Sequence, residues 1–356
     1  MTSLQMAAWV SLGCAALPTL MVMSNLVRYR GVRAPSAALD VADRVDVCIP
    51  ARNEAANIEA CVASVLAQRG VPVRALAYDD QSDDDTPRLL ANLRSRSTAV
   101  VAVPTEPLPQ GWNGKQWGCE RMGQASDAAW LLFTDADVRF EPDAVAAAVA
   151  FAKHSGSDLV STVPHERCGS IGEALVVPLI HFMLLGYLPM GLMRRDPRPS
   201  LAAGCGQFLL VRREAWLRAG GHAAFRESMH DGIRLPRAVR AAGGRTDLFD
   251  GTALVSCRMY RGMAQTWRGF AKNAYEGLGS LPVLVFFTSL HLAGHVLPFV
   301  MLGLVAVGVP VDARVVGLFG LAAMAGLFTR LLLVMRFRQP VIGALLHPVA
   351  MLLMTA

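Results

Sequence analysis

The sequence is poor in charged residues. Asp, Glu, Lys and Arg make up 17% of the 356 residues, whereas hydrophobic residues make up 53%, and the mean hydropathy is +0.37. Soluble globular domains carry about 25% charged residues. The composition therefore argues against a wholly soluble chain and predicts segments that lie in a membrane.

Paired cysteines are also missing from the sequence. The seven cysteines, at positions 14, 48, 61, 119, 168, 205 and 257, are scattered, and none belongs to a Cys-X-X-Cys motif. An odd and dispersed set argues against both a disulfide framework and a structural zinc site. It is typical of reduced thiols and agrees with a catalytic region in the cytoplasm.

Basic residues do not alternate with aromatic residues in the way that a nucleic-acid-binding surface requires. The net charge of +6 includes two clusters, Arg28–Arg33 and Arg194–Arg198, which lie beside apolar segments. We expect these clusters to meet anionic lipid headgroups, and we expect no nucleic-acid partner.

Uncharged runs at both ends predict membrane-spanning helices. Residues Gln5–Val27 carry no charge and precede Arg28, which predicts an uncleaved anchor over residues 1–28 and a linker over 29–44. No basic residue precedes this run, which argues against a signal peptide. The C-terminal region, residues 281–356, holds three further apolar runs: Leu281–Val309, Val315–Val334 and Val341–Ala356.

The basic residues indicate how the chain is oriented. Arg336 and Arg338 lie between the second and third C-terminal runs, so the positive-inside rule places that loop on the same side as Arg28. We expect a multi-pass protein of the cell inner membrane with residues 45–280 in the cytoplasm. The third run has about 16 residues against the ~20 that a bilayer needs, so a tilted, re-entrant or cut-off segment is an alternative.

One apolar stretch, residues 171–193, interrupts the expected cytoplasmic domain. It is nearly uncharged and contains Pro178 and Pro189. We expect an interfacial segment that lies among the headgroups and opens a path from the bilayer to the site. A further crossing is the alternative, but it would place Asp137 and Asp231 on opposite sides of the membrane.

The central region alternates short apolar runs with helical patterns. This alternation predicts an α/β domain with a mainly parallel sheet and helices on both faces. Ligands of such sheets bind beyond the carboxyl ends of the strands. Strands are expected at Val45–Ile49, Val73–Tyr78, Ala99–Val103 and Ala129–Thr134, and helices at Ala55–Ala67, Asp84–Arg94 and Lys115–Gln124.

Two carboxylates follow the apolar run Trp130–Phe133. The Asp135-Ala136-Asp137 motif places them at the carboxyl end of an expected strand. Mg²⁺ and Mn²⁺ bind through one or two protein carboxylates and take their other ligands from substrate phosphates and water. The motif therefore predicts a divalent cation and a nucleotide-diphosphate substrate, with an Asx-type turn as the structural alternative.

Other polar groups follow the neighbouring strands. Glu54, Asp79 and Asp80 are candidates to accept hydrogen bonds from a base and a ribose, with a solvated loop as the alternative. Lys115 lies in a glycine-rich turn before an expected helix and suits a phosphate, although a surface lysine is the alternative. Gly206 allows a ligand to approach the backbone closely, or else forms an ordinary bend.

Asp231 opens a helical run that ends near Gly243, and it is the candidate general base. A carboxylate at this place would remove the proton of an acceptor hydroxyl as that hydroxyl attacks the donor. A helix N-cap is the structural alternative. His230 is the less favoured base, because a neighbouring residue on this turn points elsewhere.

Taken in order, these motifs resemble a family 2 glycosyltransferase with a GT-A fold. The resemblance spans Val45–Tyr275, and Gly111–Lys115 together with the membrane segments resembles the branch that glycosylates lipids, including carotenoid, hopanoid-associated and ceramide-type enzymes. It implies inverting transfer of one hexose from a nucleotide-diphospho-sugar, with UDP-sugars favoured, to a hydroxyl of a membrane lipid or isoprenoid. It also implies the site residues. Asp135 and Asp137 would hold the metal, Asp231 would be the base, and substrate contacts would come from Pro50, Arg52, Glu54, Asp79, Asp80, Lys115, Asp135 and Gly206.

The sequence departs from the family pattern at two places. The usual acidic pair reads His230-Asp231, and the Gln-X-X-Arg-Trp signature of processive relatives is absent. Processive polymer synthesis is therefore disfavoured. Arg261, Trp267 and Arg268 are candidates to contact the diphosphate or the acceptor, with a purely juxtamembrane position as the alternative.

Two other functions stay open at this point. Transfer of sugar to a polyprenyl phosphate would need basic residues near the interface, which Arg194, Arg195 and Arg198 offer. A membrane subunit that only binds a nucleotide sugar is the other. His291 and His295 are expected to face the interior of the helix bundle or the interface rather than to hold a metal, because no third ligand of suitable spacing is evident.

Overall fold

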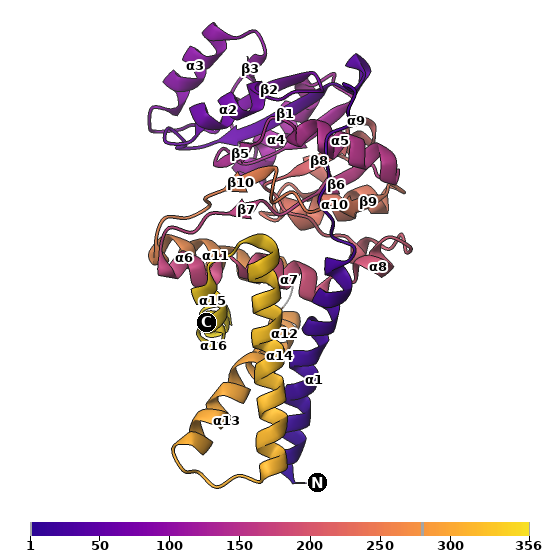
Figure 1. Ribbon diagram of the computed structural model, residues 1–356. Helices are drawn as coiled ribbons and strands as arrows, with labels where there is room; N and C mark the ends of the chain where they lie inside the picture. The colour runs from indigo at the N-terminus through magenta and orange to yellow at the C-terminus, as the bar shows by residue number, and fades with distance from the viewer. Residues whose placement is uncertain (1, 279–280, 356) are drawn as a thin grey trace. The chain divides into compact units, whose positions relative to one another are not determined.

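The computed structural model describes residues 2–278 and 281–355 (Figure 1). Contacts divide the chain into two compact units. The sheet unit comprises Tyr29–Arg167 and Gly191–Met259. The helical unit comprises Met1–Arg28, Cys168–Met190 and Tyr260–Ala356.

The sheet unit is built on a mixed sheet with the strand order β3-β2-β1-β4-β8-β6-β9. The first four strands in this order are mutually parallel, as the sequence predicts, whereas β8 is antiparallel to both of its neighbours. An apolar run does not reveal strand direction, because a buried strand is apolar either way. The strands are β1 (Val45–Ala51), β2 (Val73–Asp79), β3 (Val100–Ala102), β4 (Trp130–Phe133), β6 (Leu159–Ser161), β8 (Leu209–Arg212) and β9 (Thr246–Leu248).

Helices cover both faces of this sheet, as expected for an α/β domain. Buried side chains of α2, α3 and α5 pack on one face, and those of α4, α9 and α10 pack on the other. The helix expected from Ala55 begins at Ile58, since a turn closed by the Asn57 amide and the Glu54 carbonyl precedes it. The helices are α2 (Ile58–Leu66), α3 (Thr86–Arg96), α4 (Gly114–Ala125), α5 (Ala144–Ser155), α9 (Arg213–Arg218) and α10 (Asp231–Ala241), with short turns η1 (Val41–Asp43), η2 (Pro199–Leu201) and η3 (His222–Phe225).

A second, small sheet has the order β5-β10-β7. Its strands are β5 (Val138–Phe140), β10 (Val255–Cys257) and β7 (His165–Glu166). Because β5 follows the Asp135-Ala136-Asp137 motif directly, the motif lies between strands of the two sheets and is held at both ends.

A buried carboxylate ties β1 to β2. Asp46 is fully buried and accepts two hydrogen bonds from Arg74, at 2.9 and 2.6 Å, and one from the Ser126 hydroxyl at 2.6 Å. Asp127, whose side chain is 74% exposed, pairs with the same arginine. The buried charge is thus compensated by an arginine and a hydroxyl.

The described residues of the helical unit include three helical segments long and apolar enough to cross a membrane. They are α1 (Ser3–Leu26), the continuous stretch Leu281–Ala306, and α14 (Ala313–Phe337). The stretch Leu281–Ala306 joins α12 (Leu281–His291), the π-helical turn η4 (Leu292–Val296) and α13 (Leu297–Ala306).

The third C-terminal crossing is not found. Residues 341–355 form two short helices, α15 (Val341–Leu345) and α16 (His347–Thr355), instead of one span. Leu346 ends the first helix, and Pro348, which has no amide hydrogen, occupies the first turn of the second. The expectation of three C-terminal spans is therefore wrong for the described residues, which provide two.

Helices α1 and α14 lie side by side and run in parallel (Figure 1). Near their N-terminal ends Ala8 packs with Val315 and Phe319, and further along Thr329 donates a hydrogen bond to Thr19 at 2.8 Å. Arg28, which follows α1, and Arg336, in the last turn of α14, therefore lie at the same end of the unit, as the charge pattern predicts.

The stretch 171–193 contains short helices rather than a span. Pro178 precedes α7, and Pro189 separates it from α8. The interfacial role expected for this stretch stays a prediction. The helices are α6 (Ile171–Val176), α7 (Leu179–Tyr187) and α8 (Met190–Met193), and α11 (Met263–Leu278) belongs to the same unit as the first two.

Candidate active site

A lysine joins two carboxylates at the centre of the sheet unit. Lys115 Nζ lies 2.6 Å from Asp135 Oδ1 and 3.0 Å from Asp231 Oδ2. These residues come from three different elements: the first turn of α4, the loop after β4 and the first residue of α10. The structure therefore brings together three of the residues predicted from separate motifs.

Local chemistry fixes each of these side chains. Asn113 caps α4, because its side chain accepts a hydrogen bond from the Lys115 amide at 3.0 Å. Asp135 follows a fully buried strand, so it lies at the carboxyl end of β4. Asp231 is 4% exposed and accepts a hydrogen bond from the Gly232 amide at 2.8 Å.

Glycines make room for the candidate base. A Cβ atom added to Gly206 would lie 2.2 Å from Asp231 Oδ1, and one added to Gly232 would lie 2.7 Å from the Gly206 nitrogen. The Gly204 amide donates to the Gly232 carbonyl at 2.7 Å. The start of α10 is thus docked on the loop before β8, and Gly206 faces the Asp231 carboxylate. Its predicted contact with substrate stays a prediction.

Burial and the charge of Lys115 together set the pKa values of the two carboxylates, Asp135 and Asp231. Burial raises the pKa of Asp135 to about 6, although the Lys115 ammonium opposes the rise. Burial also acts to raise the pKa of Asp231, but the ion pair with Lys115 outweighs it and the net pKa is lowered. Asp231 is therefore ionised at neutral pH, which is the state that a general base requires.

The Asp137 carboxylate interacts with the Cys257 thiol, but one of its buried oxygens lacks a geometric hydrogen bond to any described residue. Its Oδ1 has no hydrogen-bond partner among the described residues, and burial raises the pKa of this carboxyl group. An orphaned carboxylate oxygen beside a second carboxylate fits a hard divalent cation. Within residues 2–278 and 281–355 no group of three or more His, Cys, Asp or Glu side chains forms a complete metal site. A cation held here would draw further ligands from substrate and water.

The predicted donor-side residues gather beyond β1 and β2. Arg52 Nη1 lies 3.6 Å from Asp80 Oδ2, and a Cβ atom on Gly114 would lie 2.1 Å from the same oxygen. The Glu54 side chain accepts a hydrogen bond from Asn57 at 2.9 Å, and burial raises the pKa of Glu54. Pro50 occupies the penultimate position of β1.

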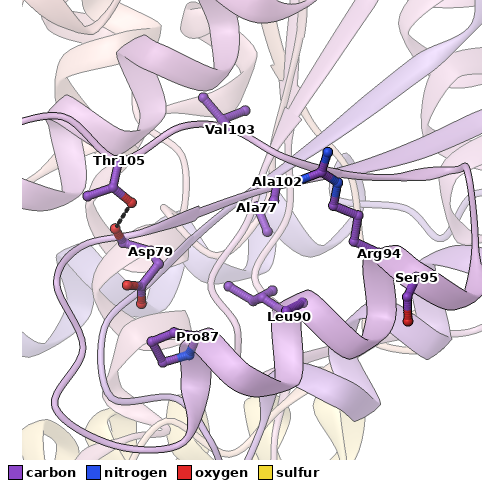
Figure 2. Close-up of a pocket in the computed structure, with 10 residues that line it drawn as sticks. Ala77, Asp79, Pro87, Leu90, Arg94, Ser95, Ala102, Val103 and Thr105 are labelled. Atoms are coloured by element: carbon purple, nitrogen blue, oxygen red, sulfur yellow. Dashed lines mark hydrogen bonds between the residues drawn. The ribbon is translucent and has the colours of Figure 1, made fainter.

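A cavity of about 430 Å³ lies between α3 and the edge of the sheet (Figure 2). Asp79 lies at one side of it, where its backbone carbonyl accepts a hydrogen bond from Thr105 at 2.9 Å. Asp79 Oδ1 is buried and has no hydrogen-bond partner among the described residues. Of the predicted site residues only Asp79 lines this cavity, so the cavity does not contain the Lys115 cluster.

Two buried residues near the cluster carry no clear sequence signal. Glu166 lies on β7, and burial together with the Asp137 charge raises its pKa well above the usual range. His222 is fully buried, its Nδ1 accepts a hydrogen bond from Trp216 Nε1 at 3.0 Å, and burial lowers its pKa to about 3. Both come from short elements that lack a hydrophobic period, so pattern analysis does not select them.

Three further candidates, Arg261, Trp267 and Arg268, belong to the helical unit. Arg261 lies just before α11, and the other two lie on it. Their predicted contacts with substrate stay predictions. His291 and His295 are 2% and 0% exposed, which confirms that they face the interior of the helical unit.

Comparison with known proteins agrees with this architecture. Residues 46–217 match the model of glycosyl transferase family 2. Residues 46–217 therefore form a domain of the glycosyl transferase family 2 type, and the sheet unit has an α/β, GT-A-like fold.

Individual relatives are distant. The 4,4'-diaponeurosporenoate glycosyltransferase of Staphylococcus haemolyticus (strain JCSC1435) is 24% identical over 259 residues, which cover 72% of this chain and 68% of the relative. The succinoglycan biosynthesis protein ExoO of Rhizobium meliloti (strain 1021) is 28% identical over 122 residues, 34% of this chain and 33% of that protein.

One similar solved structure is the mannosyltransferase PcManGT from Pyrobaculum calidifontis in complex with GDP-Man and Mn²⁺. The TM-score is 0.59 at 18% identity, and the match covers 97% of this chain and 99% of the other. At this identity the similarity establishes a shared fold.

Proposed function

We propose that the protein is a membrane-bound, inverting glycosyltransferase that transfers one hexose from a nucleotide-diphospho-sugar to a hydroxyl of a membrane lipid or isoprenoid. The observation that carries this proposal is geometric: Lys115 Nζ lies 3.0 Å from Asp231 Oδ2 and also pairs with Asp135 of the Asp135-Ala136-Asp137 motif. A base, a cationic side chain and a carboxylate pair are the parts that such a transfer requires.

In the proposed reaction Asp231 accepts the proton of the acceptor hydroxyl. The hydroxyl oxygen forms a bond to the anomeric carbon while the bond from that carbon to the diphosphate breaks, so the configuration inverts. Lys115 lies where it can meet the negative charge of the leaving diphosphate. Asp135 and Asp137 would hold Mg²⁺ or Mn²⁺, which when bound would neutralise the diphosphate.

The donor side of the site would be formed by Pro50, Arg52, Glu54, Asp79 and Asp80. Carboxylates there suit the hydroxyl and N–H groups of a nucleoside. A UDP-sugar is the favoured donor. The backbone at Gly206 would lie against the bound sugar.

The acceptor is proposed to come from the membrane. The helical segments that could cross a membrane supply the attachment, and Arg261, Trp267 and Arg268 would contact the acceptor or diphosphate. One relative is named for glycosylation of 4,4'-diaponeurosporenoate, which favours a carotenoid-type acceptor. We place the protein in the cell inner membrane with the sheet unit, and hence the site, in the cytoplasm.

Transfer to a polyprenyl phosphate is the second candidate. It would use the basic cluster Arg194–Arg198 to bind the acceptor phosphate. However, Arg194 is paired with Asp247 at 2.9 Å and Arg198 with Asp196 at 2.6 Å. Two of the three arginines in this cluster thus already pair with carboxylates within the protein, which favours the hydroxyl acceptor.

The test is turnover by the purified, detergent-solubilised full chain. Mn²⁺ or Mg²⁺, UDP- and GDP-sugars and a total lipid extract are supplied, and released nucleotide and new glycolipid are measured by mass spectrometry. We expect metal-dependent nucleotide release with a matching glycolipid. Donor binding without any product from a lipid extract or from polyprenyl phosphate would refute the proposed activity.

Variants assign the roles. Asp231→Asn should bind donor normally but lose transfer, whereas Asp137→Ala should weaken metal-dependent donor binding itself. Asp143→Asn is the matched control, because Asp143 is exposed and its side chain makes no cap hydrogen bond. Full-rate transfer by Asp231→Asn would show that another group is the base.

A further inference from the structure

Arg330 is a cation enclosed within the helical unit. Its side chain is 0% exposed, although it lies on α14, a helix long and apolar enough to cross a membrane. Nη2 donates weakly to the Gly343 carbonyl at 3.4 Å. Nε and Nη1 have no hydrogen-bond partner in the part of the chain that the structure describes. Burying a guanidinium group without an anion is unfavourable, so an ionisable residue at this place indicates a site.

Two histidine side chains from other elements pack against the face of α14 that carries Gly326. His347 Nε2 of α16 and His295 Nδ1 of η4 are 3.1 Å apart, and both rings are fully buried. Gly326, which precedes Arg330 by one helical turn, makes room for them, since a Cβ atom there would lie 3.1 Å from His295 Nδ1 and 3.3 Å from His347 Nε2. The positive charge of Arg330 interacts electrostatically with both imidazole rings. A π-helical turn, such as the one that carries His295, is frequent at functional sites.

The polar atoms of this cluster that lack a partner are mostly hydrogen-bond donors. Whichever histidine donates within the pair, two neutral rings keep one N–H donor and one bare nitrogen outside it. The outer atoms, His295 Nε2 and His347 Nδ1, have no partner among the described residues. The N–H groups on Nε and Nη1 of Arg330 add donors and a positive charge. Donors therefore outnumber acceptors, and the complement is an oxyanion.

The depth of the cluster points to a lipid as the source of that oxyanion. Arg330 precedes Phe337, the last residue of α14, by two turns, which places it roughly 10 Å inside the helix end. That end carries Arg336, and the helix around Arg330 is apolar. An anionic group at this depth is best delivered by a molecule whose remainder is apolar.

We propose that Arg330, His295 and His347 form a binding site for the anionic group, phosphate or carboxylate, of a membrane lipid. The guanidinium group provides the charge and the paired N–H donors, and the histidine pair provides a further donor at its side. The site lies in the helical unit and shares no residue with the Lys115 cluster. It therefore does not depend on the identity of the base or of the sugar.

The experiment uses the delipidated full chain in a neutral detergent. Thermal unfolding is followed while phosphatidylglycerol, oleate, phosphatidylcholine or inorganic phosphate is added. We expect phosphatidylglycerol or oleate to raise the unfolding midpoint in a saturable way, as a ligand of the folded state does, and phosphatidylcholine and inorganic phosphate to have little effect. An equal shift with inorganic phosphate would overturn a lipid site in favour of a free-anion site.

Arg330→Gln tests the residue itself. Without lipid this variant should unfold at a higher temperature than the wild type, because it removes an uncompensated buried charge. Its affinity for the anionic lipid should fall at least about tenfold, as loss of a charge-assisted pair requires. Arg336→Gln is the matched control on the same helix, since Arg336 is exposed, and it should keep the saturable shift.

A second variant guards against misfolding of the first. His347→Phe keeps an aromatic ring but removes both ring nitrogens, and it should weaken lipid binding less than Arg330→Gln does. Native mass spectrometry of the wild type should show one tightly retained anionic lipid. Unchanged lipid binding in both variants would refute the proposed site.

Discussion

Substitution of Gly206 by alanine should impair the candidate base without touching a charged residue. The added methyl carbon would lie 2.2 Å from Asp231 Oδ1, whereas real Cβ contacts essentially never fall below 3.0 Å. The carboxylate or the backbone must therefore move by about 0.8 Å or more. Gly206 does not have a positive φ, so alanine is otherwise tolerated by the backbone.

The expected magnitude follows from the geometry around Asp231. Its carboxylate is held by Lys115 at 3.0 Å and by the Gly232 amide at 2.8 Å, so a shift of this size breaks or lengthens both contacts. A misplacement of about 1 Å costs on the order of 10²-fold in rate. Overpacking should also cost about 1–3 kcal/mol of stability.

The assay compares kcat, the donor KM and the thermal midpoint of Gly206→Ala with those of Gly31→Ala. Gly31 is the control, because an added Cβ there meets only the Asp250 carbonyl oxygen at 3.9 Å. We expect kcat of Gly206→Ala to fall on the order of 10²-fold, and donor KM to change little. Wild-type kcat in a folded Gly206→Ala variant would refute the reasoning that Asp231 must occupy its present position.

Three further predictions concern other contacts. Lys115→Gln removes the cation that keeps the pKa of Asp231 below its usual value, so that pKa should rise. The acid limb of the kcat profile should then move to higher pH, and an unmoved limb would exclude Lys115 as its cause. Gly114→Ala places a methyl carbon 2.1 Å from Asp80 Oδ2, so donor KM should rise more than kcat falls, and the reverse pattern would argue against Asp80 on the donor side. Asp46→Ala leaves Arg74 without its buried partner and should destabilise the sheet unit by about 2 kcal/mol, because Arg74 is partly exposed and can be rehydrated. Asp127→Ala, at the exposed end of the same network, should leave the thermal midpoint unchanged, and equal effects of the two would contradict the importance of burial.

The order of elements in the sheet unit could be predicted from sequence because the strands are short apolar runs with polar ends. Trp130–Phe133, for example, is wholly buried, and the two aspartates that follow it must lie at the edge of the sheet. The paired runs of positive charge likewise indicated that α1 and α14 end on the same side. These are local properties of the chain, so one sequence contains them.

Other features depend on which segments meet. Position 206 requires glycine because the Asp231 carboxylate, which comes from a later element of the chain, lies against it. The antiparallel direction of β8 likewise depends on the strands beside it in the sheet. The last apolar run is as hydrophobic as a span but breaks after Leu346.

Sequence by itself therefore determined the α/β class, the family resemblance and the residue types available for catalysis. Only the tertiary structure decided that Lys115 bridges Asp135 and Asp231, and that His295 pairs with a histidine 52 positions away, His347. The physical reason is that such contacts depend on long-range packing and on the charge balance of buried groups, which no local pattern of residues records.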